Sequence, residues 1–233
     1  MNQNIKVLCM PLKTAARQGL IDSYPYEGIR KVKENKVKIE PLSFEELDHW
    51  LNFLQEKDRE WYDLILFWSR TGLRPGELFA LRWENVDFFN KQILICENRP
   101  YFGGTGPTKT ETSDRVIELR PAVVVALKRQ QTRTGLINKW VFLNHRQNQW
   151  NATSFREAFK FHLRLASLKV RPAKQMRHTF ATLHLGSGEN PSWVSTTLGH
   201  SNLEITLKRY NRFIPNLTRE DGSAFEKALN GHN

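Results

Sequence analysis

The stretch Lys174-Gln-Met-Arg-His-Thr-Phe-Ala181 marks the fold and its chemistry most sharply, and it follows a proline by two residues. A proline just ahead of a run with helical apolar spacing predicts a helix, here over 172–186. Lys174 and Arg177 lie three residues apart and share its polar face. Two cations held side by side repel each other unless an anion lies between them, so this face is either solvated or an anion site. The apolar face of the expected helix carries Met176, Phe180 and Leu183.

The pattern on either side of this helix is mostly helical. Ser43-Phe-Glu-Glu46 is a capping box, in which the two side chains satisfy free backbone N–H groups at a helix start. Two short apolar runs, 92–96 and 115–119, flank a Gly- and Thr-rich loop and predict an antiparallel hairpin. We therefore expect an α+β fold, mostly helical with a small antiparallel sheet. The other expected elements are helices over 8–20, 43–56, 61–70, 75–81, 122–132, 153–168, 191–198, 203–210 and 221–229, and a short strand over 141–143.

The chain is long and apolar enough to fold, and it is strongly basic. Its 233 residues are 39% hydrophobic and 11% aromatic, which excludes disorder as the overall state. The formal net charge of +11 indicates a polyanionic partner, nucleic acid before membrane. Cys9 and Cys96 are too few for a disulfide framework or a cysteine-based zinc site. No apolar run reaches the length of a membrane span and no signal-peptide pattern is visible, so we expect a cytoplasmic protein.

Four residues outside the quoted stretch suit phosphate chemistry, and each has an ordinary structural alternative. Arg74 lies between a helix-stopping glycine and a helix-starting proline, so its guanidinium lies beside free backbone N–H groups where a phosphate could bind. The alternative is a surface arginine on a turn. His200 lies just beyond a helix end, Tyr210 ends an amphipathic helix, and Lys109 lies in a polar loop. Each of these three, taken alone, is more often structural than functional.

The order of these motifs along the chain favours the functional interpretation of these residues over the structural one. The chain closely resembles the tyrosine recombinase (phage integrase) family over about residues 41–221, and its tail over 214–222 is similar to that of bacterial phage and island integrases. The resemblance implies the catalytic-domain fold of that family. It also implies site-specific cleavage and rejoining of DNA strands for integration or excision of a phage or mobile element. The motifs that carry it are Thr71-Gly-Leu-Arg-Pro-Gly-Glu-Leu78, a hairpin lysine, Lys174-Gln-Met-Arg-His-Thr-Phe-Ala181, Leu198-Gly-His200 and Tyr210.

The resemblance implies a role for each site residue. Tyr210 would attack a DNA phosphodiester, leaving a 3′-phosphotyrosyl link and a free 5′-hydroxyl. Arg74 and Arg177 would clamp the scissile phosphate, and His200 would donate a hydrogen bond to it. Lys109 would be the general acid that protonates the departing 5′ oxygen.

The residue types fit this chemistry independently. A phenol with a pKa of about 10 is only about one part in a thousand ionised at pH 7, so nearby cations and a proton acceptor must favour the phenolate. Guanidinium donors stabilise charge on phosphoryl oxygens, each by about 3–4 kcal/mol if it resembles one oxyanion-hole donor. The motifs contain neither a carboxylate cluster for magnesium nor an ATP-binding glycine loop, so we expect no metal and no cofactor.

Three features depart from the family pattern. Lys174 occupies the position where the family most often has a histidine that assists proton transfer from the tyrosine, and a charged lysine cannot act as a base. The spacing from His200 to Tyr210 is ten residues, where nine is commoner. Residues 1–28 are expected to be only a remnant of the helical core-binding domain, which predicts weaker DNA binding and poor recombination with the nucleophilic machinery intact. A basic linker over 29–41 and a catalytic domain over 42–233, with a C-terminal exchange segment, complete the expected organisation.

Two other functions stay open at this point. A type IB topoisomerase would use the same covalent chemistry without pairing two duplexes, and a truncated DNA-binding remnant would bind without recombining. The expected partners are double-stranded DNA at attachment sites, further copies of the chain in a tetramer on DNA (a monomer off DNA), and accessory DNA-bending or directionality proteins. The expected location is the bacterial cytoplasm, associated with the nucleoid. Glu77 is expected to steady the turn at Arg74, His178 and His184 to make packing or polar contacts, and the tryptophans to lie in the core.

Overall fold

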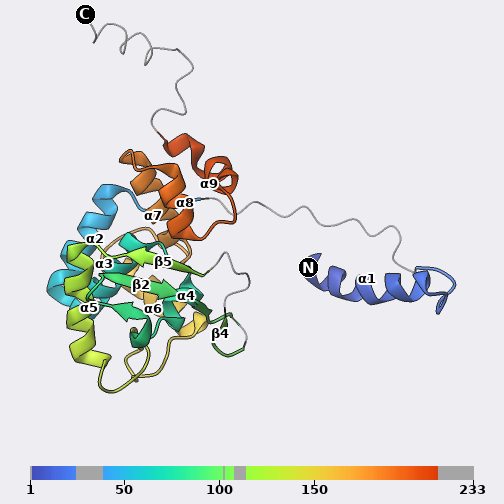
Figure 1. Cartoon of the computed structure of the whole chain (residues 1–233), viewed down its shortest axis with the longest axis horizontal. Helices are drawn as coiled ribbons and strands as arrows, with labels where there is room; N and C mark the ends of the chain where they lie inside the picture. The colour runs from blue at the N-terminus through green and yellow to red at the C-terminus, as the bar shows by residue number, and fades with distance from the viewer. Residues whose placement is uncertain (1, 25–38, 102, 108–113, 215–233) are drawn as a thin grey trace, which may run out of the picture. The chain divides into compact units, whose positions relative to one another are not determined.

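The computed structural model describes residues 2–24, 39–101, 103–107 and 114–214. The chain divides into two compact units, Met1–Lys38 and Ile39–Asn233. In the first unit the described residues form one helix, α1 (Asn2–Arg17), followed by turns (Figure 1). This helix begins and ends earlier than the predicted span of 8–20.

The described part of the second unit is mostly helical, as predicted. Ser43 caps the first of its helices, and the predicted capping box is present: the Ser43 hydroxyl accepts from the Glu46 N–H at 3.2 Å and the Glu46 carboxylate accepts from the Ser43 N–H at 3.0 Å. Asn190 caps a later helix in the same way, ahead of a proline at the first helical position. The helices are α2 (Phe44–Lys57), α3 (Arg59–Thr71), α4 (Pro75–Ala80), α5 (Pro121–Thr134), α6 (Ala152–Leu165), α7 (Gln175–Gly186), α8 (Pro191–Leu198) and α9 (Leu203–Tyr210), with short 3-10 turns η1 (Trp83–Asn85) and η3 (Asn211–Phe213).

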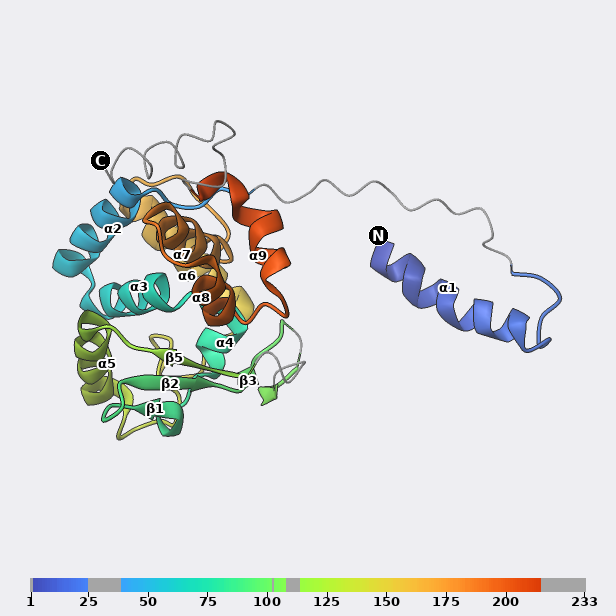
Figure 2. The same ribbon diagram turned by 45° about the horizontal axis from the view of Figure 1, so that its top comes forward.

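The predicted hairpin is the centre of a small antiparallel sheet. Strands β2 (Gln92–Ile95) and β5 (Arg115–Glu118) pair in the register Ile93 with Ile117. Strand β1 (Val86–Asp87) adds to the other side of β2, giving the order β1-β2-β5, and β3 (Glu97–Asn98) pairs separately with β4 (Gly106–Pro107). Figure 2 shows this sheet on one side of α3 and the group α7, α8 and α9 on the other.

Two hydrophobic clusters hold the second unit together. The larger one joins α2, α3, α5, α6 and the sheet, and its centre is aromatic: Trp50 packs edge-on against Phe159, and Trp68 against Phe155. The smaller cluster joins α7, α8 and α9. The tryptophans are buried or packed against these clusters, apart from Trp140, which is buried beside two cations, so the prediction that they are structural is confirmed. The smaller cluster consists of Phe180, Ala181, Leu185, Val194, Leu198, Tyr210 and Ile214, with Ile39, Trp193, Leu207 and Phe213 packed against it.

In the second unit, one predicted element differs in kind and another begins later than predicted. The segment 141–143 forms no continuous strand: isolated antiparallel bridges flank it, from Trp140 to Arg82 and from Leu143 to Gln149, while the Val141 carbonyl accepts from the Gln130 side chain. The helix predicted over 172–186 begins at Gln175, because the three residues before it form a tight turn. The predicted helix over 221–229 and the tail over 215–222 lie outside the described residues.

Candidate active site

Arg74 lies at the start of α4, where the sequence predicts it. Its backbone N–H and its Nη1 both donate to Glu77, at 2.8 Å and 2.6 Å, and Nη2 donates to the Gly199 carbonyl at 3.3 Å. These contacts confirm that Glu77 steadies this turn. The Arg74 side chain keeps 40% of its surface exposed, so its guanidinium can still reach a ligand.

Glu77 also binds a second arginine that the sequence analysis did not single out. Arg115 at the start of β5 donates from Nη2 to Glu77 at 2.8 Å and from Nε to the Thr197 carbonyl at 2.6 Å, and both charged side chains are almost wholly buried. Burial alone would raise the pKa of Glu77, but Arg115, Arg74 and Arg177 outweigh it and hold that pKa below its usual range. The carboxylate is therefore ionised at neutral pH and links two arginines.

Arg177 is a third arginine of the site, and it is buried. Its Nη1 donates to the Gly72 carbonyl at 3.0 Å and its Nη2 to the Leu198 carbonyl at 2.5 Å. Burial and then Arg74 lower the pKa of Arg177 from 12.5 to about 9, so the guanidinium stays charged at neutral pH. We call Arg74, Arg115 and Arg177 the arginine cluster. Its three cations face the single Glu77 carboxylate, so positive charge is in excess where an anion could bind.

His200 adjoins the arginine cluster, directly after Gly199. Its Nδ1 lies 2.7 Å from the Thr206 hydroxyl. Burial, then Arg177 and Arg74, lower the pKa of His200 to about 3, so the imidazole is neutral at physiological pH. With the Thr206 hydroxyl donating to Nδ1, the ring proton lies on Nε2, where it can be donated to a ligand oxygen.

Tyr210 ends α9 and is fully buried. Burial raises the pKa of its phenol, although Arg177 and Arg209 oppose that rise, which shows that Arg177 lies close enough to act on it. The phenol oxygen lies 2.6 Å from Nδ1 of His178. His178 was predicted to make a packing or polar contact, and the contact is to the predicted nucleophile. His184, on the same helix, contacts the Phe180 carbonyl instead, as a structural histidine would.

The remaining two predicted site residues stand apart from these contacts. Lys174 precedes α7, is exposed, and lies close enough to His178 to lower its pKa. Lys109 lies outside the described residues. The structure therefore brings together four of the predicted site residues: Arg74, Arg177, His200 and Tyr210. Three further residues contact members of this group: Glu77, Arg115 and Thr206. The role of Lys109 stays a prediction.

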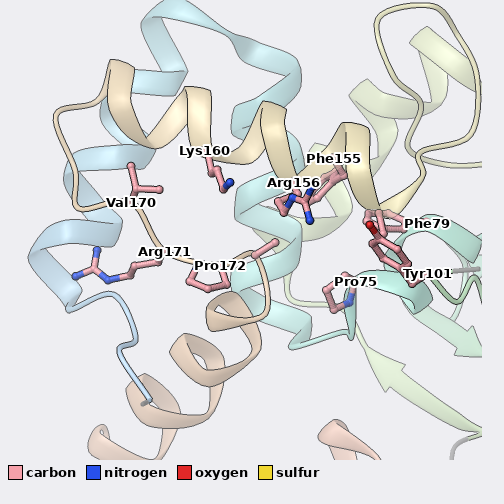
Figure 3. A pocket seen from close by; sticks show the side chains of 11 residues that line it. Pro75, Phe79, Tyr101, Phe155, Arg156, Lys160, Val170, Arg171 and Pro172 are labelled. Atoms are coloured by element: carbon pink, nitrogen blue, oxygen red, sulfur yellow. The ribbon is translucent and has the colours of Figure 1, made fainter. Parts of the chain in front are cut away.

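An apolar pocket of about 510 Å³ lies beside the start of α4 and the turn before α7. Pro75, the residue after Arg74, and Ala173, the residue before Lys174, both line it. Figure 3 shows Arg156 and Lys160 extending from α6 across the pocket from Pro172. The pocket thus combines an apolar floor with cations at its edge, next to the proposed anion site.

Among the described residues, no group of three or more His, Cys, Asp or Glu side chains could hold a metal ion. No helix among them is long and apolar enough to cross a membrane.

Residues 40–215 match the model of the phage integrase family, and the chain belongs to that family. It is 29% identical over 241 residues to prophage integrase IntR of Escherichia coli K12, a match that covers 93% of this chain and 58% of that protein. The chain thus spans little more than half the length of that relative. The Tn1549 transposon integrase in complex with circular intermediate DNA superposes with a TM-score of 0.76 at 23% identity, over 98% of this chain and 79% of that one. A lambda integrase tetramer bound to a Holliday junction gives a TM-score of 0.63 at 15% identity, over 84% and 57%. These likenesses establish a tyrosine recombinase catalytic-domain fold, as predicted.

Proposed function

We propose that this chain is the catalytic part of a site-specific DNA recombinase that cleaves and rejoins strands through a 3′-phosphotyrosyl intermediate on Tyr210. One observation carries the proposal. Arg177 and Arg74 donate to the neighbouring carbonyls of Leu198 and Gly199, His200 follows directly in the chain and both arginines lower its pKa, and Arg177 also acts on the pKa of the buried Tyr210. Guanidinium groups at a neutral histidine form a site for a phosphodiester, and a phenol beside it is a nucleophile.

Each residue has a part in the proposed reaction. Arg74 and Arg177 bind the scissile phosphate and stabilise the charge that builds on its oxygens, while His200 donates from Nε2. The Tyr210 oxygen attacks phosphorus, and the bond to the 5′ oxygen breaks. Lys109 protonates that leaving oxygen. Because the phosphotyrosyl link conserves the energy of the broken bond, rejoining needs no ATP.

Tyr210 is fully buried, so the proposed reaction requires that the phosphate and the phenol come together. Lys174 is exposed beside α7 and serves in this scheme as a further phosphate contact rather than as a base. The pocket lined by Pro75 and Ala173 gives room for the sugar and base next to that phosphate.

The proposed partner is double-stranded DNA at attachment sites. Its support is the net charge of +11 and the two similar structures, one solved with circular intermediate DNA and the other as a tetramer on a Holliday junction. By analogy we propose that this chain acts as a tetramer on DNA, is a monomer off DNA, and uses accessory bending or directionality proteins. Because the proposed substrate is DNA, we propose a location in the bacterial cytoplasm, associated with the nucleoid. The assignment of 1–28 to a core-binding domain and of 29–41 to a linker stays a prediction.

The alternatives differ in what they predict. The matches to integrases favour a recombinase over a type IB topoisomerase. A DNA-binding remnant differs from both enzymes because it would form no covalent bond to DNA. Incubated with nicked duplexes from the host attachment region, the chain should form a protein–DNA adduct on a denaturing gel that Tyr210→Phe abolishes. Salt-dependent binding with no adduct would instead identify a DNA-binding remnant.

A further inference from the structure

The hydrogen bond between His178 and Tyr210 is not used by the mechanism above. His178 is the fourth residue of α7 and Tyr210 the last of α9, so the contact joins two helices through residues that are 32 positions apart in sequence. His178 is 7% exposed and Tyr210 is not exposed at all, and 2.6 Å separates Nδ1 from the phenol oxygen. A short contact between two enclosed polar groups fixes both the ring and the phenol.

The protonation states make this contact directional. Burial lowers the pKa of His178 to about 4, helped by Arg209 on α9 and by Lys174 and Arg177 at the start of α7. Burial raises the pKa of Tyr210. At neutral pH the imidazole therefore lacks one proton and the phenol retains its own. The arrangement that fits both is a phenol O–H donating to an unprotonated Nδ1, with the ring proton on Nε2.

The other predicted acceptor does not suit the task. Lys174 carries a positive charge and has no lone pair to take a proton. His200 directs its Nδ1 to Thr206 and is the phosphate donor in the proposed mechanism. Of the histidines that the structure describes in the site, His178 is the one in contact with the phenol oxygen.

We propose that His178 is the general base that takes the proton of Tyr210 during strand cleavage, in place of the residue at position 174. This inference rests on the proposed function. The phenol O–H bond breaks as an N–H bond forms on Nδ1, the phenol oxygen bonds to phosphorus, and the bond from phosphorus to the 5′ oxygen breaks. The leaving oxygen takes a proton from Lys109. On rejoining, the 5′-hydroxyl returns its proton to Lys109 as its oxygen bonds to phosphorus, the bond from phosphorus to the tyrosine oxygen breaks, and that oxygen takes back the proton from Nδ1.

The surrounding cations make this base responsive to DNA. Arg177, Arg209 and Lys174 all disfavour a protonated His178 in the free protein. A phosphate bound between Arg177 and Lys174 offsets those charges, so the imidazole becomes more basic when substrate is present. Proton transfer is thereby favoured in the DNA complex over the free protein.

The test measures the rate of adduct formation by the full chain on a duplex with a bridging 5′-phosphorothiolate, whose leaving group needs no acid. His178→Asn keeps a hydrogen-bonding group near the Nδ1 position but cannot accept the proton. His184→Asn makes the same change on the same helix, away from the site. We expect His178→Asn to slow adduct formation about 10²- to 10⁴-fold and to remove the acidic limb of the wild-type pH–rate profile. His184→Asn should retain both rate and profile.

The outcomes separate the two proposals. If wild type forms the adduct, Tyr210→Phe does not, and His178→Asn stays within a few-fold of wild type with its acidic limb intact, His178 is not the base and the recombinase function stands. If wild type forms no adduct, both proposals fail. Thermal melting and DNA binding of His178→Asn, measured beside His184→Asn, show whether any loss of rate comes from a folded protein that still binds.

Discussion

Removing the charge of Glu77 should lower both the stability of the fold and the rate of strand cleavage. It is 2% exposed, and it holds the backbone and Nη1 of Arg74 and the nearly buried guanidinium of Arg115. Glu77→Gln keeps the size of the side chain and removes its charge. Breaking a buried ion pair by removing one partner costs about 3–5 kcal/mol, because the other charge stays buried without compensation. At about 2–4 °C per kcal/mol for a domain of this size, Tm should fall by about 6–20 °C.

The assay is urea unfolding at several pH values, with Glu157→Gln as the matched control. Glu157 is 57% exposed and pairs with Arg156 and Lys160 on the surface, where solvent screens the charges, so its substitution should leave the stability nearly unchanged. Because the folded-state pKa of Glu77 is depressed, its contribution is present above its ordinary pKa of about 4.5 and is lost as pH falls through the folded value. The difference in the free energy of unfolding between wild type and Glu77→Gln should therefore become smaller at acidic pH.

A stability loss for Glu77→Gln no larger than that for Glu157→Gln, or a gap that does not change with pH, would refute this reasoning. It would mean that the buried arginine finds compensation elsewhere and that Glu77 does not hold the arginine cluster. Adduct formation supplies a second readout. Arg74 would lose its charged partner and keep only neutral acceptors, among them the Gly199 carbonyl at 3.3 Å, so cleavage should slow even under conditions where the variant is fully folded.

Three further predictions follow from the site. Thr206→Val removes the hydroxyl that orients His200 and should slow adduct formation by up to about tenfold, whereas Thr206→Ser should restore the rate. Gly72→Ala places a Cβ about 2.6 Å from the Phe180 ring at a φ of +62°, and should cost about 2–5 kcal/mol in urea unfolding; a neutral result would show that the two helices separate easily. Affinity for duplex DNA, measured by fluorescence anisotropy, should fall by about three to five orders of magnitude from 50 to 200 mM salt if about 6–10 phosphates are contacted, and a shallow slope would contradict a DNA role.

The sequence predicted best what local signals determine. The capping box at Ser43 and the Asn190 cap with its following proline place α2 and α8 almost to the residue, because a cap depends on neighbours only three residues away. The strand expected over 141–143 failed for the opposite reason. Its apolar residues are buried, but its backbone groups bond to Leu81 and Gln130, contacts that no local pattern encodes.

In the candidate site, too, local signals predicted some residues and missed those whose partners are distant in sequence. Family motifs identified Arg74, Arg177, His200 and Tyr210, and the structure brings them together. Arg115 lies on a predicted strand, but its partner Glu77 is 38 residues away, so nothing near it in sequence indicates a buried ion pair. The contact from His178 to Tyr210 was missed because a histidine on a helix face fits packing equally well until the fold supplies its partner.

Arg177 illustrates how the fold neutralises a buried charge without a carboxylate ligand. The two carbonyls that accept from its guanidinium, Gly72 and Leu198, lie at the C-terminal ends of α3 and α8. Each helix C-terminus carries roughly half a negative charge from its aligned peptide dipoles, so the two ends together supply about one unit. This compensation comes from the main chain, and no side-chain substitution at either position removes it. The fixed partners of this guanidinium are therefore dipoles, which hold the cation in place and would not compete as full anions with the phosphate that we propose it binds.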